Sequence, residues 1–262
     1  MFHFDDEYTY RMPAHFGGVK GGDLHDLQYD DVTSIGVSYL TDEEQLAQYV
    51  PDAFELLEPS VNIEYQKCQG VQWMGGGGYT LLAVMTPVRH LSSGTEGAFA
   101  LVVWENNTDP ILGGREDTGI PKVFADIPDY HLLGGHASAH ASHEGRVFLE
   151  LDVQVDHELG PEEIAARNGD GRINQMGWRH IGNIGRPGAA LSHATLYPVD
   201  ATYVSGGTGA GTATWTKLNY LQSPTQFHII AALADLPVVE RRPGVFAKLT
   251  THLRGDLARE LV

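Results

Sequence analysis

The stretch from Gly113 to Phe124 reads Gly-Gly-Arg-Glu-Asp-Thr-Gly-Ile-Pro-Lys-Val-Phe. Its first half is rich in turn-forming residues, and its second half is apolar apart from one lysine. In an extended chain Ile120, Lys122 and Phe124 share a face, because successive side chains of a strand alternate. Desolvation on such a face lowers the pKa of an ammonium group, and a neutral amine can attack a ketone to form a Schiff base. The plainer alternative is a lysine whose stem lies along apolar surface while its charge reaches water.

The composition limits the fold and the kinds of partner. A chain of 262 residues is long enough for a substantial core, and we expect a single domain over residues 1–262. Glycine accounts for 31 residues, which suits the many turns of a β-rich protein. The formal net charge of −17 argues against nucleic acid and against an anionic membrane as partners.

The cysteine content and the N-terminus favour a reduced, cytoplasmic setting. Cys68 is the only cysteine, which excludes an intrachain disulfide and a zinc site made of cysteines. The first residues lack the positive charge and the apolar run of a signal peptide. The apolar runs, such as Ala98 to Trp104, are too short to span a bilayer.

Alternating apolar residues predict many strands and few helices. Strands are expected at residues 33–40, 61–65, 79–84, 99–104 and 146–155. Two further strands are expected at 195–204 and 212–221, joined by a hairpin turn at the glycines of 206–211. Helices are predicted at 42–49, 161–166 and 246–261, while 227–234 fits a helix or a strand and the segment up to about Asp31 reads as an arm or loops. These elements predict an α+β fold dominated by antiparallel sheet, with small helical additions.

Two segments resemble motifs of other chemistries. The glycines of 206–211 are followed by β-like sequence, so they offer no helix N-terminus to a dinucleotide. His136, His140 and His143 have a spacing that would bind zinc or iron on a helix, but the glycines around them favour a loop or strand. We therefore expect neither a metal nor a bound cofactor.

Three stretches, in the same order, resemble the acetoacetate decarboxylase superfamily. Residues 114–122 are similar to its signature, in which Gly-Arg-Glu is followed by Pro-Lys, and residues 39–65 and 233–240 are similar to an earlier and a later segment. The resemblance implies a cone-shaped β-barrel with a few peripheral helices, homo-oligomers and chemistry without a cofactor. It also implies that Lys122 forms the imine and that Glu64 is an active-site carboxylate.

The departures from the family pattern concern the same site. Val123 stands where the decarboxylases carry a second lysine, and Leu81 stands where they carry a glutamate after a Tyr-Thr pair. Their early arginine falls on Val32. Without the second cation, desolvation has to do more to keep Lys122 neutral. The sequence therefore resembles the branch of the superfamily that uses pyruvate as an aldolase-dehydratase rather than the branch that decarboxylates acetoacetate.

We expect Lys122 to attack the keto carbon of pyruvate or a similar 2-oxo acid, so that the enamine adds to an aldehyde and the adduct loses water. Glu64 is expected to shuttle protons, and Tyr79 to hydrogen-bond the departing oxygen. The substrate-binding candidates are Arg115 for the carboxylate, Glu116 to position water or Lys122, and Leu81 and Val123 to widen the space for the aldehyde.

Two other functions fit the same residues. The first is decarboxylation of a bulkier β-keto acid through Lys122, which release of CO2 from a β-keto acid would reveal. The second is a catalytically silent or regulatory binding domain on the same scaffold, which would form no borohydride-stable adduct with pyruvate.

Overall fold

Long strands make up most of the computed structural model, which describes residues 2–20, 26–169 and 171–262. The long strands are β3 (Asp26–Leu40), β5 (Ser60–Val71), β6 (Gly77–His90), β7 (Glu96–Glu105), β10 (His136–His143), β11 (Arg146–Glu158), β12 (Arg172–Gly182), β13 (Ala189–Trp215) and β15 (Gly244–Arg254). The short strands are β1 (Tyr8–Thr9), β2 (Val19–Lys20), β4 (Phe54–Leu56), β8 (Lys122–Phe124), β9 (His131–Leu133), β14 (Glu240–Arg241) and β16 (Arg259–Leu261). The helices are α1 (Glu43–Ala47), α2 (Thr108–Asp117), α3 (Pro161–Asn168) and α4 (Phe227–Ala234), with 3-10 turns η1 (Ala14–Phe16), η2 (Gln72–Met74) and η3 (Gly255–Leu257).

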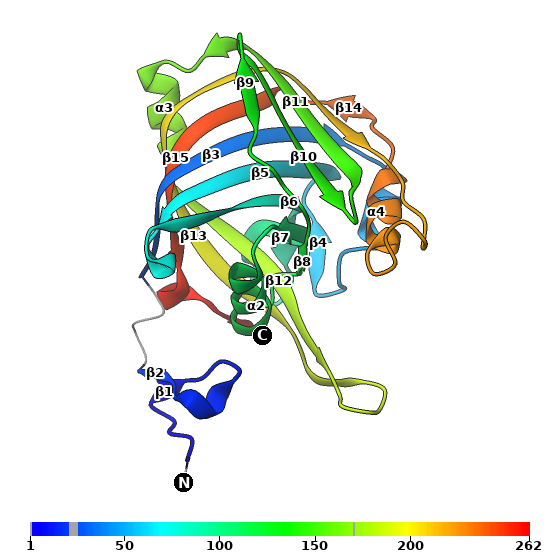
Figure 1. The fold of residues 1–262 in the computed structure, drawn as a ribbon. Coiled ribbons are helices and arrows are strands. Elements are labelled where there is room, and N and C mark those ends of the chain that lie inside the picture. The colour runs from blue at the N-terminus through cyan, green and yellow to red at the C-terminus, as the bar shows by residue number, and fades with distance from the viewer. Residues whose placement is uncertain (1, 21–25, 170) are drawn as a thin grey trace.

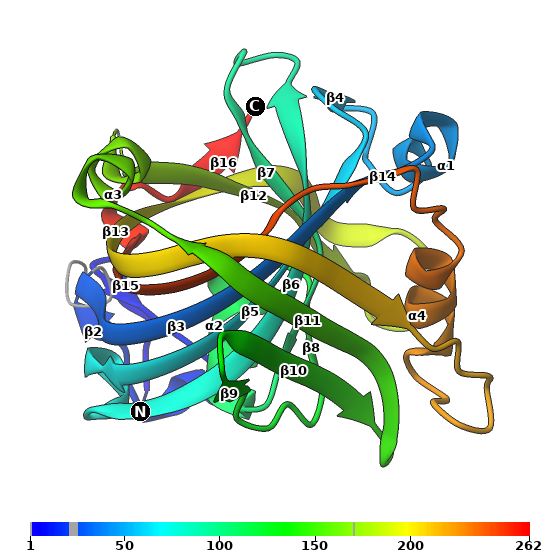
Figure 2. The ribbon, with the colours of Figure 1, turned by 90° about the horizontal axis from the view of Figure 1, so that it is seen from above.

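Seven strands of the described chain close into a ring, in the order β12-β7-β6-β5-β3-β15-β13, because β13 also pairs with β12. The short β7–β12 pair is parallel, and the other pairs around the ring are antiparallel. From β13 the sheet continues through β11 and β10 to β9. Figures 1 and 2 show these strands curving around one another, with α3 and α4 on opposite sides of the periphery. The predicted fold class, a predominantly antiparallel β-barrel with a few peripheral helices, is confirmed.

Alternation along the strands gives the ring wall two faces with different surroundings. On β5, Val61, Ile63 and Tyr65 belong to the main hydrophobic core, in which residues of β3, β5 and β6 pack against those of β10 and β11. Glu64 and Cys68 point to the opposite face, where they line an interior cavity. One face of the wall therefore stabilises the fold, and the other is available for a ligand.

The predicted hairpin turn at residues 206–211 is wrong, because these residues lie inside the continuous strand β13. A Cβ on Gly209 would lie 1.9 Å from the Gln154 carbonyl oxygen of β11, and a Cβ on Gly211 would lie 2.7 Å from the Gly244 Cα of β15. These glycines allow β13 to pack closely between two neighbouring strands, and none of them has a positive φ. A glycine cluster that signals a turn in sequence here serves close strand packing.

The helix predicted at residues 246–261 is also wrong, because β15 and β16 occupy most of that segment. A spacing of four residues puts Leu249 and Leu253 on one face of a helix, but an even spacing also puts them on one face of a strand. Both side chains belong to the apolar cluster around Tyr29 and Cys68. The pairing with β3 decides the outcome, since it satisfies the backbone along nearly the whole of β15.

The other strands and helices predicted from the sequence are confirmed, except that the strand expected at 212–221 ends at Trp215. The strand expected at 33–40 is the second half of β3, and the helix expected at 42–49 is α1, whose N-cap Asp42 accepts a hydrogen bond from the Gln45 amide. Residues 227–234, which fit a helix or a strand, form α4. The described part of the opening segment is more ordered than an arm of loops, since it contains β1, η1 and β2 and since β3 already begins at Asp26. Residues 1 and 21–25 of this segment lie outside the described residues. Among the described residues, no helix combines the length and hydropathy needed to cross a membrane.

Candidate active site

The interior face of the ring encloses a cavity of about 460 Å³, within the range of small-molecule sites. Part of its apolar lining comes from alternate residues of β6 and β7 and from the approach to β8, namely Leu81, Ala83, Met85, Val103 and Ile120. Its charged lining consists of Arg11, Glu64, Glu105, Asp109, Asp117 and Lys122. The cavity therefore combines a mostly apolar wall with a few ionisable groups.

Lys122 reaches the cavity because the chain reverses between α2 and β8. Gly119, with φ +70°, ends the helical segment in a conformation that favours glycine, and Pro121 follows it. The Ile120 amide then donates to the Gly114 carbonyl, and β8 pairs in parallel with β7 so that Lys122 lies beside Val103. The Lys122 side chain is only 15% exposed. The local turn chemistry thus folds the lysine back beneath the helix that precedes it.

The Lys122 amine forms an ion pair with Glu105, the last residue of β7. Nζ lies 2.7 Å from Glu105 Oε1, and the Glu105 side chain is fully buried. Burial raises the pKa of the Glu105 carboxyl above its ordinary value, and the nearby Lys122 ammonium opposes that rise. A carboxylate that is costly to keep ionised is a suitable acceptor for a proton from the amine beside it.

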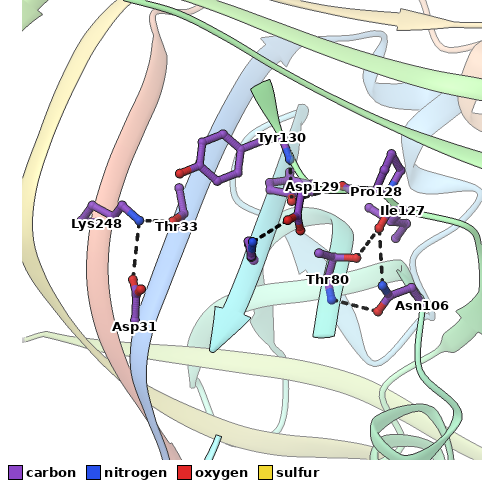
Figure 3. Close-up of polar contacts among 11 residues, drawn as sticks. Asp31, Thr33, Thr80, Asn106, Ile127, Pro128, Asp129, Tyr130 and Lys248 are labelled. Carbon is purple, nitrogen blue, oxygen red and sulfur yellow. Dashed lines mark hydrogen bonds and ion pairs between the residues drawn. The ribbon is translucent and has the colours of Figure 1, made fainter. Parts of the chain in front are cut away.

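A hydrogen-bond network at the end of β7 fixes the position of Glu105. The next residue, Asn106, accepts from the Thr80 amide at 2.9 Å, and Thr80 Oγ1 donates to the Ile127 carbonyl at 2.6 Å (Figure 3). Asn106 Nδ2 also contacts the Ile127 carbonyl, at 3.4 Å. These bonds tie β6, the end of β7 and the segment after β8 together. The two strands that carry the ion pair therefore cannot shift independently.

Two buried tyrosines line another part of the cavity. Tyr29 Oη and Tyr79 Oη are 3.1 Å apart, and Trp73 Nε1 donates to Tyr29 Oη at 3.2 Å. Burial raises the pKa of both phenols, so each stays protonated and can donate a hydrogen bond. Cys68, also buried in the wall, has a raised pKa for the same reason, with Glu105 adding to the effect. This side of the cavity thus supplies neutral hydrogen-bond donors.

Glu64 lies on the cavity wall as a partly buried and well-supported carboxylate. Its Oε1 accepts from Ser34 Oγ at 2.6 Å and from Gln66 Nε2 at 3.0 Å. Four of the sequence-predicted site residues, Lys122, Glu64, Tyr79 and Leu81, therefore line one cavity.

The other three predicted site residues do not line that cavity. Arg115 lies on the exposed side of α2 and donates from Nη1 to the Lys122 carbonyl at 2.9 Å. Glu116 lines an adjoining cavity beside the N-terminal segment, and Val123 packs against the main core. Phe124, expected on the same face as Lys122, is 44% exposed. The side chains of Arg115, Glu116 and Val123 are therefore not placed to contact a ligand in the main cavity.

The three histidines of the His136–His143 segment lie on a strand rather than a helix. His136 Nε2 pairs with Asp152 Oδ1 at 3.0 Å, and the buried His143 Nδ1 bonds Ser223 Oγ at 2.9 Å. Within the described residues, no group of three or more histidine, cysteine, aspartate and glutamate side chains is arranged to hold a metal ion.

Sequence reasoning missed Glu105 and Arg11. Glu105 ends an apolar strand, and the alternation of side chains along that strand could have revealed it. Val103 and Glu105 alternate with the core residues Val102 and Trp104, so they face the other side of the strand. The approach of Lys122 depends on the β7–β8 pairing, which no local pattern specifies. Arg11 belongs to the N-terminal segment, whose position beside α2 is equally non-local.

Gly114 of α2 lies close to the Lys122 side chain, and we expect Gly114→Ala to impair the site. An added Cβ would lie 2.4 Å from Lys122 Cδ and Cε and 2.9 Å from Nζ. Displacing the amine should lower turnover by about tenfold or more, because small misplacements of a reacting group are costly. The fold should persist, since alanine favours a helix over glycine by about 1 kcal/mol.

Steady-state kinetics and a thermal melt of Gly114→Ala and Gly113→Ala would check this. A Cβ on Gly113 would find its nearest neighbour at 3.8 Å, an ordinary contact, so its effect should be the smaller one. Equal activity in the two variants would contradict the close approach of Lys122 to Gly114.

Comparison with known proteins identifies the family of the chain. The profile of the acetoacetate decarboxylase (ADC) family matches residues 11–256. The chain belongs to this family. A curated acetoacetate decarboxylase from Burkholderia ambifaria (strain MC40-6) is 32% identical over 218 residues, which cover 78% of this chain and 76% of that protein.

Two solved structures show the same fold. The acetoacetate decarboxylase of Legionella pneumophila superposes with a TM-score of 0.74 at 18% identity, covering 99% of this chain and 91% of the other. The enduracididine biosynthesis enzyme MppR, complexed with the condensation product of pyruvate and imidazole 4-carboxaldehyde, gives a TM-score of 0.70 at 17% identity, with 90% and 88% coverage.

Proposed function

We propose that this protein is a Schiff-base lyase that condenses pyruvate, or a similar 2-oxo acid, with an aldehyde and dehydrates the product. The proposal is carried by one observation: the Lys122 amine lies in a largely apolar cavity, 2.7 Å from the buried carboxyl of Glu105. An amine so placed can form a covalent imine with a ketone and use it as an electron sink.

The first step is attack of a neutral Lys122 on the keto carbon. The Lys122 ammonium passes a proton to Glu105, whose pKa is raised by burial. The new N–C bond gives a carbinolamine, and loss of its hydroxyl as water, with a proton returned from the site, leaves the iminium. Glu105 thus supplies a proton acceptor for Lys122, which lacks the second lysine of the decarboxylase pattern beside it.

The second step is carbon–carbon bond formation. Loss of a C3 proton from the iminium to a carboxylate of the cavity gives an enamine, and its C3 attacks the aldehyde carbon. The aldehyde oxygen takes up a proton and becomes a hydroxyl. Removal of the second C3 proton, with transfer of a proton to that hydroxyl, then expels it as water. Hydrolysis of the unsaturated imine frees Lys122, so that 2-oxo acid and aldehyde give an unsaturated 2-oxo acid and one water. Glu64 is another proton carrier that the cavity offers, and the Tyr29–Tyr79 pair can donate a hydrogen bond to the departing oxygen.

The shape and lining of the cavity favour a two-substrate reaction. A three-carbon acid fills only part of about 460 Å³, and Leu81, Ala83 and Met85 offer the remaining space an apolar wall. Val123 points its side chain into the core, so no second cation follows Lys122 into the site. The MppR structure with a pyruvate–aldehyde condensation product, which has a related fold, supports the same reaction type.

Decarboxylation of a β-keto acid is the second candidate, and the names of the curated relatives favour it. It would use the same Lys122 imine, with loss of CO2 in place of the C3 proton. The two reactions differ in their products, so they can be separated directly.

The test combines trapping with product analysis. Incubation with pyruvate and borohydride, followed by peptide mass mapping, should place a pyruvate-derived mass on Lys122. Pyruvate with a panel of aldehydes should then yield a conjugated product that absorbs in the near ultraviolet. Rapid CO2 release from acetoacetate without such a product would establish the decarboxylase, and absence of any adduct at Lys122 would reject both reactions.

A further inference from the structure

We propose that Arg11 binds the carboxylate of the substrate at the mouth of the cavity. The inference rests on the proposed function and assigns the group that selects for acids. Arg11 and Lys122 are the two cationic side chains that line the cavity among the described residues. Lys122 must be neutral when it attacks a carbonyl. At that stage, Arg11 is the positively charged side chain that remains, among the described residues of the lining, to bind a negatively charged substrate.

The charge of the cavity makes this cation decisive. Besides Glu105, which holds the proton of Lys122 at that stage, three acidic side chains, those of Glu64, Asp109 and Asp117, line the same space. A 2-oxo acid that enters brings a further negative charge, which these groups repel unless a cation compensates. The structure thus needs a dedicated partner for the substrate carboxylate, and Arg11 is placed to be that partner.

The position of Arg11 fits this role. Its Nη2 pairs with Asp117 Oδ2 at the end of α2, and its Cζ lies 4.0 Å from the Cβ that a side chain at Gly113 would have. A Cβ on the next residue of the helix, Gly114, would lie 2.4 Å from Lys122 Cδ and Cε. The two cations therefore approach successive residues of one helix, from the N-terminal segment and from β8.

Arg11 also lies where two cavities meet. It lines the main cavity and the adjoining one, and Leu27, Asp117, Thr118 and Tyr197 are likewise shared between the two. Figure 1 shows the N-terminal segment at the end of the molecule where α2 lies. With 41% of its side chain exposed, Arg11 can meet an incoming anion before that anion reaches Lys122.

The chemistry of guanidinium allows a second partner. Arginine carries five N–H donors in a planar fork, and the contact with Asp117 is made by Nη2. The remaining donors can take a carboxylate in a paired geometry. Asp117 then acts as a positioning residue that orients the fork.

Arg115, which the sequence favoured for this role, is the matched control. It lies on the same helix as Asp117, but its Nη1 donates to the Lys122 carbonyl and its side chain does not line the cavity. The variants Arg11→Gln and Arg115→Gln remove the same charge on the two sides of α2.

The experiment compares pyruvate with its methyl ester, which keeps the keto group and lacks the carboxylate charge. Calorimetric titration measures affinity, and borohydride trapping at Lys122 measures the concentration for half-maximal adduct formation. We expect Arg11→Gln to weaken pyruvate binding about 10- to 100-fold, as for a lost charge-assisted hydrogen bond, and to change the ester by less than about twofold. Arg115→Gln should leave both ligands within about twofold.

Unchanged pyruvate affinity in Arg11→Gln, or equal losses for pyruvate and the ester, would overturn the proposal. Arg11→Lys tests the same point with the charge retained and the fork removed, and it should give an intermediate affinity. Calorimetry detects binding even if no covalent bond forms. It therefore tests carboxylate binding by Arg11 separately from imine formation by Lys122. A selective loss of pyruvate affinity without any wild-type adduct would uphold Arg11 and reject the lysine chemistry.

Discussion

Replacing Lys122 with arginine should abolish the borohydride-stable adduct and lower turnover by at least about a thousandfold, the scale of losing a covalent nucleophile. Arginine keeps a positive charge beside Glu105, so the buried carboxylate retains a counter-ion. Its guanidinium stays protonated and cannot form an imine with a ketone. The fold should therefore persist while the chemistry stops. Peptide mass mapping after reduction, and initial rates with pyruvate and an aldehyde, measure the two effects.

The control for this prediction is Lys248→Arg. Lys248 lies on β15, where its amine bonds Thr33 Oγ1 and lies 3.6 Å from Asp31 Oδ1, and it does not line the cavity (Figure 3). This variant should keep the wild-type adduct and rate. Substantial turnover by Lys122→Arg, or an adduct that maps to Lys248, would contradict the assigned nucleophile.

Local sequence carried much of the information about Lys122. The glycine and proline pattern of residues 113–124 is local chemistry: Gly119 supplies a positive φ, and Gly114 leaves room for the lysine. The alternation of side chains along β5 likewise predicted that Glu64 lies on the other face of the strand from Val61, Ile63 and Tyr65. Such features follow from a few neighbouring residues and can be read without the fold.

The partners of Lys122 depend on pairing between distant strands, which the sequence does not specify locally. Glu105 faces the lysine because β8 pairs in parallel with β7, and it lies directly across from Leu81 on β6. The carboxylate that the family pattern carries after the Tyr-Thr pair is missing at Leu81, but a carboxylate is present at the cross-strand position. Side chains paired in this way are neighbours in space. The carboxylate that is missing at Leu81 thus has a counterpart in Glu105, 24 positions later in the sequence.

The errors in the fold have the same origin. The glycines of β13 and the leucines of β15 are each compatible with two local structures, and tertiary packing selects the strand in both cases. The close approach of β13 to β11 and β15 requires glycine for lack of space rather than for a turn. Only the registers of the assembled sheet distinguish these alternatives.

Replacing Glu105 with glutamine should lower turnover by about 100- to 10,000-fold, the range for loss of a general acid-base group. The substitution keeps the volume of the side chain and removes its capacity to accept a proton from Lys122 2.7 Å away. Glu105→Asp, which keeps the carboxyl but shortens its reach, should restore part of the activity. Initial rates and the rate of adduct formation measure the effect.

The pH dependence gives this prediction a second readout. Burial raises the Glu105 pKa above 4.5, so the wild-type rate should rise with pH through that higher value as the carboxylate forms, and Glu105→Gln should lack this limb. The stability changes in the opposite direction. Between pH 4.5 and the raised value the native state binds more protons than the unfolded state, so the free energy of unfolding falls as pH rises. Urea titrations of the wild type and Glu105→Gln at several pH values isolate this contribution.

Glu64→Gln is the comparison that decides between the two carboxylates of the site. Glu64 Oε1 already has Ser34 and Gln66 as hydrogen-bond partners, whereas Glu105 is buried and contacts the amine itself. A carboxylate in contact with the Lys122 amine can take its proton directly, whereas the hydrogen bonds of Glu64 are to other side chains. The loss in Glu64→Gln should therefore be smaller, and adduct formation should be less affected than later steps. A greater loss of adduct formation in Glu64→Gln than in Glu105→Gln would transfer the proton-accepting role to Glu64.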